Sequence, residues 1–161
     1  FASDEDPELV RAAVPFSLKL IETLLAKTPQ HEGLLLTAAS GFTQYAYAFI
    51  QQDGEALVER DFAASLEARD RARRMYLRAR NYGLRGLEVR HPGISAALRR
   101  DPATAVAATD RNDAAFLYWT AAAWAAVNGM ETCRGNEYTV RSLQDYYKLY
   151  QDKDNTPCAV S

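Results

Sequence analysis

The chain has 161 residues and a mass of 17.9 kDa; 48% of its residues are hydrophobic and 25% are charged. This balance is typical of one soluble globular domain, and it excludes a disordered chain, a collagen-like repeat and a disulfide-dense miniprotein. The formal net charge of −2 and the isoelectric point near 5.7 argue against a surface built as a whole to bind nucleic acid.

Two helices are predicted in the first third of the chain. Asp6-Pro7-Glu8 is typical of a helix start, and apolar residues then recur every three to four positions as far as Thr28-Pro29. Pro15 lies inside this run, so we expect it to kink the helix or split it in two. A second helix is predicted over residues 34–52, enclosed by its neighbours because its polar face carries no charge. A membrane span is the less favoured alternative for this uncharged stretch.

Glycine and proline divide the remainder into further helices. Gln52-Asp53-Gly54 should end the second helix, His91-Pro92-Gly93 should end the third, and Asn128-Gly129 should end the last one. These later helices are predicted over residues 58–89, 94–100, 102–107 and 114–127.

The predicted organisation is a helical domain over residues 1–128 and an unassigned tail over residues 129–161 that holds at most one short helix. Cys133 and Cys158 both lie in this tail. They form a disulfide in an oxidising compartment or remain thiols, and the sequence leaves both alternatives open.

The basic segment of the chain is the first candidate for binding. Residues 60–100 carry eleven arginines against four acidic residues, which gives this segment a charge of +7. The guanidinium group suits carboxylates and phosphates, so these arginines are candidates for an anionic ligand or an acidic partner. A solvated helix face is the more ordinary explanation, because acids such as Glu67 lie four residues before arginines such as Arg71.

Aromatic residues gather on three of the predicted helices. Such rings can line an apolar pocket or channel where helices approach closely, although they more often form ordinary core. The residues are Phe42, Tyr45, Tyr47 and Phe49 on the second helix, Tyr76 and Tyr82 on the third, and Tyr118, Trp119 and Trp124 on the last.

Enzymatic chemistry finds little support. The sequence contains none of the common catalytic or nucleotide-binding motifs, and neither histidine, His31 or His91, has a nucleophile close by in sequence. The cysteines also lack the short spacing that a zinc site needs. We therefore expect no catalytic residues, no metal site and no cofactor. A hydrolase or transferase, with a histidine brought beside a carboxylate or hydroxyl, is the alternative.

The predicted helices follow one another as antiparallel hairpins, which suggests an all-α helical array. Ala72, Tyr76 and Ala79 have the small, aromatic, small spacing of the second helix of a tetratricopeptide unit, and Gly41 suits the glycine of a first helix. The distance from Gly41 to Ala72 is longer than one such unit, and no 34-residue period recurs. The pattern therefore predicts at most a cryptic, degenerate tetratricopeptide-like repeat.

Five segments carry a resemblance to a known family over about residues 5–127. The chain resembles the T component associated with bacterial TRAP transporters, and the second and fifth segments are the most specific. The segments are PFSLKLIE (15–22), ASGFTQYAYAF (39–49), YLRAR (76–80), YGLRGLE (82–88) and YWTAAAW (118–124).

The resemblance implies an all-helical periplasmic protein with cryptic tetratricopeptide motifs, often lipid-anchored. It also implies a trimer around an apolar pore or cavity, and association with the periplasmic substrate-binding subunit of the transporter. No catalytic residues come with it. This sequence departs from the family in that no lipobox cysteine precedes Phe1, so anchoring is expected only of the precursor, and residues 128–161 do not continue the helical pattern.

Two functions follow as hypotheses. The first is an accessory scaffold that docks the substrate-binding subunit and passes a small apolar or carboxylate ligand through an aromatic-lined cavity. The second is a general protein-interaction module whose arginine-rich helix binds its partner. For the cavity we name Phe42, Tyr45, Phe49, Tyr82, Trp119 and Trp124 as lining residues and Arg85 as the group facing the anion; for partner contact we name Arg73 and Arg78.

Overall fold

The structure, a computed structural model, describes the backbone of residues 6–139 and the side chains of residues 6–130. Every regular element within these residues is a helix, so the all-α prediction is confirmed there. In chain order the elements are α1 (Pro7–Lys27), α2 (Glu32–Tyr45), the π-helix η1 (Ala46–Gln51), α3 (Gln52–Leu57), α4 (Phe62–Arg90), α5 (Ile94–Arg100), α6 (Pro102–Ala107), the 3-10 helix η2 (Arg111–Asp113) and α7 (Ala114–Thr139).

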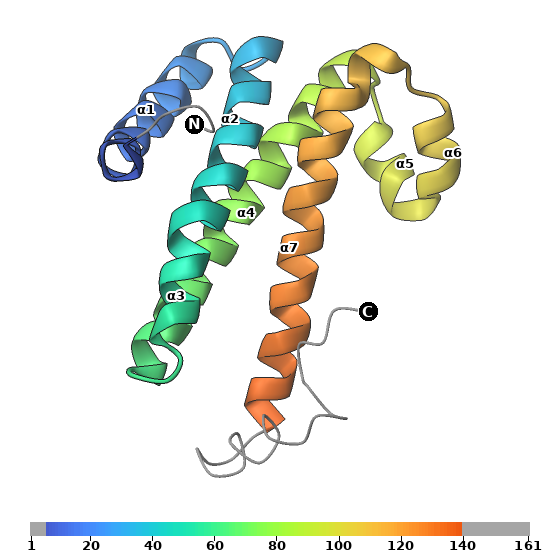
Figure 1. The fold of residues 1–161 in the computed structure, drawn as a ribbon. Coiled ribbons are helices and arrows are strands. Elements are labelled where there is room, and N and C mark those ends of the chain that lie inside the picture. Colours follow the sequence, from blue (N-terminus) through green and yellow to red (C-terminus); the bar gives the residue numbers. More distant parts are fainter. Residues whose placement is uncertain (1–5, 140–161) are drawn as a thin grey trace.

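The long helices form an array in which α4 holds the central position (Figure 1). The helix α1 packs against α2, and α2 continues through η1 and α3 as one rod that lies along α4. The helix α7 returns along α4 and also touches α2, while α5 and α6 form a small hairpin at one end. This arrangement agrees with antiparallel helical hairpins; the tetratricopeptide-like repeat stays a prediction.

Aspartates at helix starts explain several of the observed boundaries. The side chain of Asp6 accepts hydrogen bonds from the first backbone N–H groups of α1, and Asp61 and Asp101 do the same for α4 and α6. Asp110 and Asp113 form a reciprocal capping box just before α7. Each carboxylate satisfies donors that have no partner inside the helix, and its negative charge complements the positive helix end.

The prediction that Gln52-Asp53-Gly54 ends the second helix is wrong. The backbone stays helical through η1 and α3 to Leu57, and the turn lies over residues 58–61 instead. Gly54 is buried where α3 crosses α4, and a Cβ on it would lie 3.0 Å from Cβ of Ala68. The glycine therefore permits close packing of two helices here, and this contact outweighs its low helix propensity.

Two further expected interruptions are absent from the described backbone. Pro15 lies inside the uninterrupted helix α1, whose buried residues Leu18 and Leu25 hold it against α2. Asn128-Gly129 lies inside α7, which continues to Thr139 with Val127 and Met130 packed on the core.

The boundary between a domain over residues 1–128 and a tail stays a prediction. The predicted tail helix and the pairing of Cys133 with Cys158 lie outside the described side chains.

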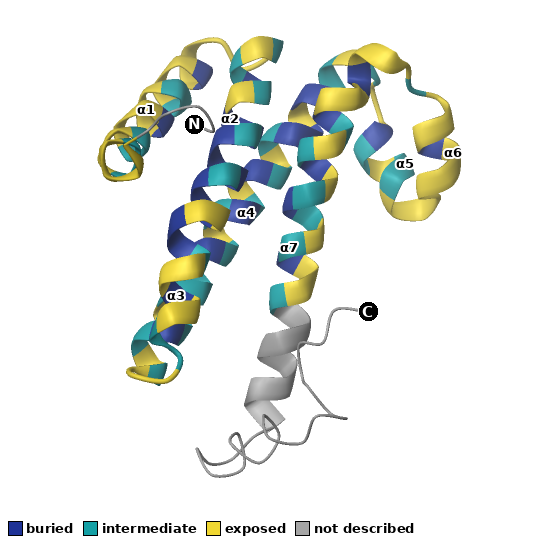
Figure 2. Ribbon diagram, viewed as in Figure 1, coloured by how far each residue is buried: buried dark blue, intermediate teal, exposed yellow. Residues whose placement is uncertain are grey.

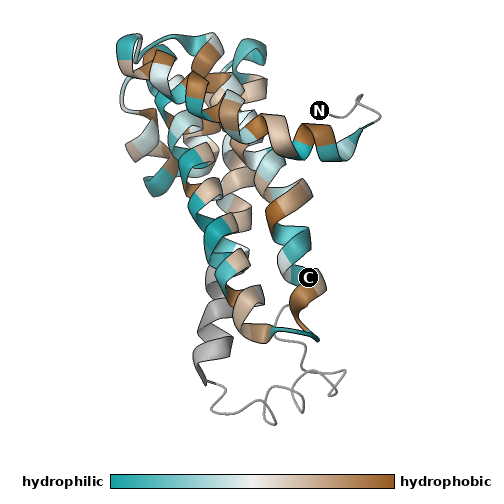
Figure 3. Ribbon diagram, turned by 90° about the vertical axis from the view of Figure 1, so that its left-hand side faces the viewer, coloured by the Kyte–Doolittle hydropathy of each residue, from teal (hydrophilic) through white to brown (hydrophobic). Residues whose placement is uncertain are grey.

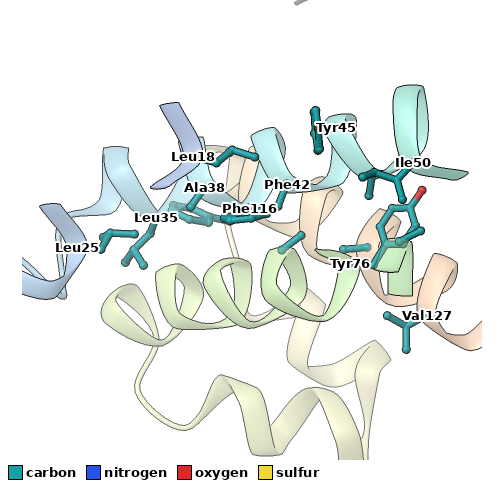
Figure 4. Close-up of a cluster of buried hydrophobic side chains, with 14 of the residues drawn as sticks. Leu18, Leu25, Leu35, Ala38, Phe42, Tyr45, Ile50, Tyr76, Phe116 and Val127 are labelled. Atoms are coloured by element: carbon teal, nitrogen blue, oxygen red, sulfur yellow. The ribbon is translucent and has the colours of Figure 1, made fainter. Parts of the chain in front are cut away.

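The hydrophobic core follows the line along which α2, α4 and α7 meet (Figures 2 and 4). Burial of α2 and η1 on most sides confirms that the predicted helix over residues 34–52 is enclosed. None of the described helices combines the length and the apolar run needed to cross a bilayer. The largest fully buried side chains are Tyr76, Phe42, Leu35, Leu87, Val127, Asp113 and Ser65.

Candidate functional site

Side chains from α1, α2 and α4 meet around Glu22. The rings of Phe42 and Tyr82 stack with centroids 5.9 Å apart and planes 17° apart. The Tyr82 hydroxyl donates to Oε1 of Glu22 at 2.9 Å, and Nη2 of Arg78 lies 3.3 Å from the same oxygen. Arg78 and Arg85 lie over the rings of Phe42 and Tyr82, at 5.3 and 5.4 Å from the centroids. We call these five residues the Glu22 cluster.

The negative charge of Glu22 is compensated by neighbouring cations. Burial disfavours the Glu22 carboxylate, but hydrogen bonds from Lys19 and Tyr82 and the charge of Arg78 outweigh burial and hold the pKa of Glu22 below its ordinary value. Burial and the bond to Glu22 raise the pKa of the Tyr82 hydroxyl. Tyr82 is thus kept as a neutral donor and Glu22 as a charged acceptor, so the cluster ties α1 to α4 across α2.

Arg78 and Arg85 are the exposed members of the cluster, and anion binding was predicted at Arg85. Its Nη2 donates to the carbonyl oxygen of Pro29 at 2.9 Å, which fastens the turn between α1 and α2. A guanidinium has five N–H donors, so one bond to a carbonyl leaves capacity for a carboxylate. Arg74 and Arg78 share the exposed side of α4 with Arg85. Arg78 lies four residues after Arg74 and seven before Arg85, spacings that place all three on one side of a helix.

Tyr45 and Phe49 lie one helical turn apart where α2 passes into η1. Their centroids are 5.5 Å apart, both side chains are buried, and the guanidinium of Arg11 lies 4.8 Å above the Phe49 ring. Arg11 also pairs with Asp53. Close by, the hydroxyl of buried Tyr76 donates to Oε1 of Gln51 at 2.8 Å, and burial raises the pKa of that hydroxyl. This region is part of the core.

The two tryptophans lie on α7 and are half-buried. Trp119 meets Tyr118 edge to face with centroids 4.9 Å apart, and Arg80 of α4 lies 5.5 Å from the Trp124 ring. Half-buried rings of this kind present one face to the core and one to solvent or to a partner. Tyr118 itself is 64% exposed.

The predicted lining residues therefore separate by location. The structure brings Phe42, Tyr82 and Arg85 together in the Glu22 cluster and pairs Tyr45 with Phe49 in the core, while Trp119 and Trp124 lie on α7. Of the residues assigned to partner contact, Arg78 belongs to the Glu22 cluster and Arg73 is partly buried on α4.

A second polar cluster fastens the ends of α2, α4 and α7. Asp113 is 1% exposed; Nη1 of Arg90 lies 3.2 Å from its Oδ1, and Nε2 of His91 lies 2.8 Å from its Oδ2. Arg90 also reaches Glu32 at the start of α2, at 2.7 Å. The backbone N–H of Asp110 donates to Asp113 as well. This bond, with His91 and Arg90, outweighs burial and lowers the pKa of the carboxyl.

Sequence reasoning missed the roles of Glu22 and Asp113 outside their own helices. The position of Asp113 just before a predicted helix indicates a capping residue, which is confirmed, but its contacts with Arg90 and His91 span more than twenty residues of sequence and need the fold. The pair does hold a histidine beside a carboxylate, as the hydrolase alternative requires. His91 directly after a helix and Asp113 at the start of another were the only local signals.

Comparison with known proteins supplies the family. The model of the TRAP transporter T-component family matches residues 3–134. A protein of Treponema pallidum (strain Nichols), described as uncharacterized, is 39% identical over 95 residues, which are 59% of this chain and 29% of that protein. The chain thus spans less than a third of that relative's length. Since the match covers most of the chain, including α1, α2, α4 and most of α7, the chain belongs to the TRAP transporter T-component family.

Proposed function

We propose that this chain is part of a periplasmic accessory subunit of a TRAP transporter, anchored through a lipid in its precursor, which docks the transporter's substrate-binding subunit. The family match over residues 3–134 carries the proposal. The helical array supports it, because stacked hairpins are a rigid support for binding surfaces. Assembly as a trimer around an apolar pore is part of the same proposal and comes from the family resemblance.

The role proposed is binding rather than catalysis. The pair of His91 and Asp113 is the arrangement nearest to a reactive one on the described residues, yet Asp113 also accepts the backbone N–H of Asp110 in the capping box of η2 and pairs with Arg90. The nearby hydroxyl of Ser95 donates to Glu88, which also accepts backbone N–H groups at the start of α5. These contacts join and cap the ends of helices, so we propose that they stabilise the fold.

For the ligand, we assign contact to the residues that keep an accessible face. These are Tyr82 and Arg85 beside α1, and Trp119 and Trp124 on α7. Phe42 is buried behind Tyr82, on which it stacks, while Tyr45 and Phe49 are buried in the core. Aromatic faces suit an apolar ligand body, and the guanidinium of Arg85 suits its carboxylate.

Docking is tested by capture from a periplasmic extract of a cell that carries a TRAP transporter. The tagged full chain should recover the substrate-binding subunit, identified by mass spectrometry. Arg78→Glu should reduce recovery several-fold because it reverses a charge on the exposed side of α4, whereas Arg99→Glu on α5 is the matched control and should not. Recovery of no solute-binding protein by the wild-type chain contradicts the docking proposal.

Ligand passage is tested separately by thermal unfolding with small aliphatic and aromatic carboxylates. Binding raises the unfolding midpoint of the wild-type chain in proportion to ligand occupancy. Arg85→Gln should abolish the shift for carboxylates, and Arg100→Gln should leave it unchanged. If no carboxylate shifts the midpoint, or if Arg85→Gln shifts as the wild type does, the ligand assignment is wrong.

The second function, a basic module for an acidic partner, has one observation in its favour. Arg71, Arg74, Arg78 and Arg85 lie on the same exposed side of α4. Binding through such a row weakens steeply as salt rises, since exposed charges are screened within about 10 Å at 0.1 M salt. A partner captured equally well at 50 and 500 mM salt excludes this function.

A further inference from the structure

The helix α1 is apolar on two sides. Leu18 and Leu25 are buried against α2, as expected of a packed helix. On another side, four large hydrophobic side chains face solvent, with Figure 3 showing the molecule from the side of α1. Together with exposed Ala13 they follow one another at spacings of four, three, four and four residues, so they form one continuous row along the helix. We call this row the outer stripe: Leu9 (60% exposed), Ala13, Phe16 (73%), Leu20 (49%) and Leu24 (44%).

The outer stripe is unusual for a surface. Only three other large hydrophobic side chains in the described part of the chain are exposed, and they lie singly on η1, α6 and α7. Scattered apolar residues need no explanation, but a contiguous row on one helix marks an interaction site. The charges on α1 are of both signs, Glu8 and Glu22 against Arg11, Lys19 and Lys27. A helix that lies on a lipid surface has a polar face rich in lysine and arginine, so a protein partner fits this helix better.

The outer stripe is complementary to itself when reversed. If two copies of α1 lie antiparallel with Phe16 opposite Phe16, the small Ala13 of each lies opposite the large Leu20 of the other. Leu9 then lies opposite Leu24, so each apolar side chain of one stripe meets an apolar side chain of the other, and the Ala13–Leu20 pairs place a small residue against a large one. Outside these apolar pairs, Lys27 at the end of one helix meets the acidic start of the other, Asp6 and Glu8.

We propose that α1 pairs with α1 of a second copy of this chain, antiparallel and about a two-fold axis at Phe16. In a two-fold contact the same patch serves both subunits, which accounts for the match of the outer stripe to its own reverse. The contact gives a dimer, or a hexamer where it joins two trimers. It is independent of the transporter function proposed above.

Position-specific crosslinking distinguishes a two-fold contact from a cyclic one. In a chain with Cys133 and Cys158 replaced by serine, Phe16→Cys should form a disulfide between two copies under mild oxidation. Leu24→Cys alone is the control and should not, because the two Leu24 positions lie about 24 Å apart along the paired helices. Mixing Leu9→Cys with Leu24→Cys should restore the crosslink. Absence of the Phe16→Cys crosslink overturns the proposal.

The mass of the unmodified assembly is the second measurement. Light scattering after gel filtration should give a dimer or hexamer for the wild-type chain. Phe16→Glu should halve that mass, because two carboxylates would meet at the axis, and Val106→Glu, which adds a charge at an exposed hydrophobic position on α6, should not. Unchanged helicity by circular dichroism shows that Phe16→Glu still folds. A wild-type monomer, a trimer unaffected by Phe16→Glu, or a monomer that binds phosphatidylglycerol vesicles through Phe16 each overturns the proposal.

Discussion

At the scale of single residues, the approach of α4 to α7 depends on two glycines. A Cβ on Gly83 would overlap Oγ1 of Thr120 and lie 3.3 Å from its Cα, and a Cβ on Gly86 would overlap the ring of Phe116. The contact at Gly86 is with a side chain, whereas the contact at Gly83 reaches the backbone of Thr120, which moves only if the helices separate. Gly83 is therefore the position at which the spacing of the two helices is set.

Gly83→Ala should lower the free energy of unfolding by about 1–3 kcal/mol, the usual cost of overpacking a core. Gly129→Ala is the matched control on α7, since a Cβ added there would have nothing within 4 Å of it. That change should raise stability by roughly 0.5–1 kcal/mol, because alanine favours helix. Urea unfolding of both variants tests this, and equal effects of the same sign would show that the helices do not meet at Gly83.

Asp113 makes stability depend on pH on the acid side. Its pKa is lowered in the folded chain, so the unfolded chain binds the proton more readily, and the contribution of Asp113 is complete only above its ordinary pKa of about 3.9. It is lost as the pH falls through the folded value. Asp113→Asn should therefore be less stable than wild type at pH 7, with a difference that shrinks toward pH 3. Glu67→Gln controls for the loss of one negative charge, and a difference independent of pH contradicts the assignment.

At the scale of elements, the join between α2 and α3 is the least ordinary feature. In a π-helix the side chains point in different directions from those of an α-helix with the same sequence. In η1, Gln51 accepts the hydrogen bond of the Tyr76 hydroxyl while Phe49 and Ile50 are buried. Helical periodicity cannot reveal such a segment, because apolar residues continue through it. The sequence pattern is equally misleading at Gly54. The low helix propensity of glycine predicts a helix end there, whereas in the fold Gly54 is a packing contact between α3 and α4.

Removing the Tyr76 hydroxyl tests how far that bond supports η1. Tyr76→Phe should cost about 0.5–1.5 kcal/mol, the net value of one hydrogen bond. Tyr47→Phe is the control from η1 itself, because Tyr47 is 59% exposed and its loss of a hydroxyl should change stability little. Chemical denaturation compares them, and the assignment fails if the two variants are equally stable.

At the scale of the whole molecule, the order of helices and the core faces were predictable from apolar spacing and capping residues. The turn at residues 58–61 and the full length of α7 were not, because tertiary contacts at Gly54, Val127 and Met130 outweigh local breaking signals. The aromatic and basic residues of the site could be named as candidates from the sequence. Their grouping around Glu22 and Asp113 could not, since it joins residues of different helices that no local pattern relates.

The array should not open uniformly. The helix α6 has one buried residue, Ala105, whereas α4 has eight and packs against α2, α3 and α7. Amide hydrogen exchange should accordingly be fastest in α6 and slowest in the middle of α4, since local opening follows the amount of buried apolar contact. Uniform protection over α4 and α6 would mean that the hairpin and the array open as one unit.

The closed corner at Asp113 has a consequence for how the family can vary. Chain leaving α4 at Arg90 and His91 returns at Asp110 and Asp113, and these two ends are bonded directly to each other. The segment between them, which contains α5 and α6, begins and ends at this bonded corner. Its length therefore has little influence on where α7 starts. Loop closure becomes only slowly more costly with added residues. Insertions and deletions between members of the family should therefore accumulate in α5 and α6, and an engineered epitope is best carried there.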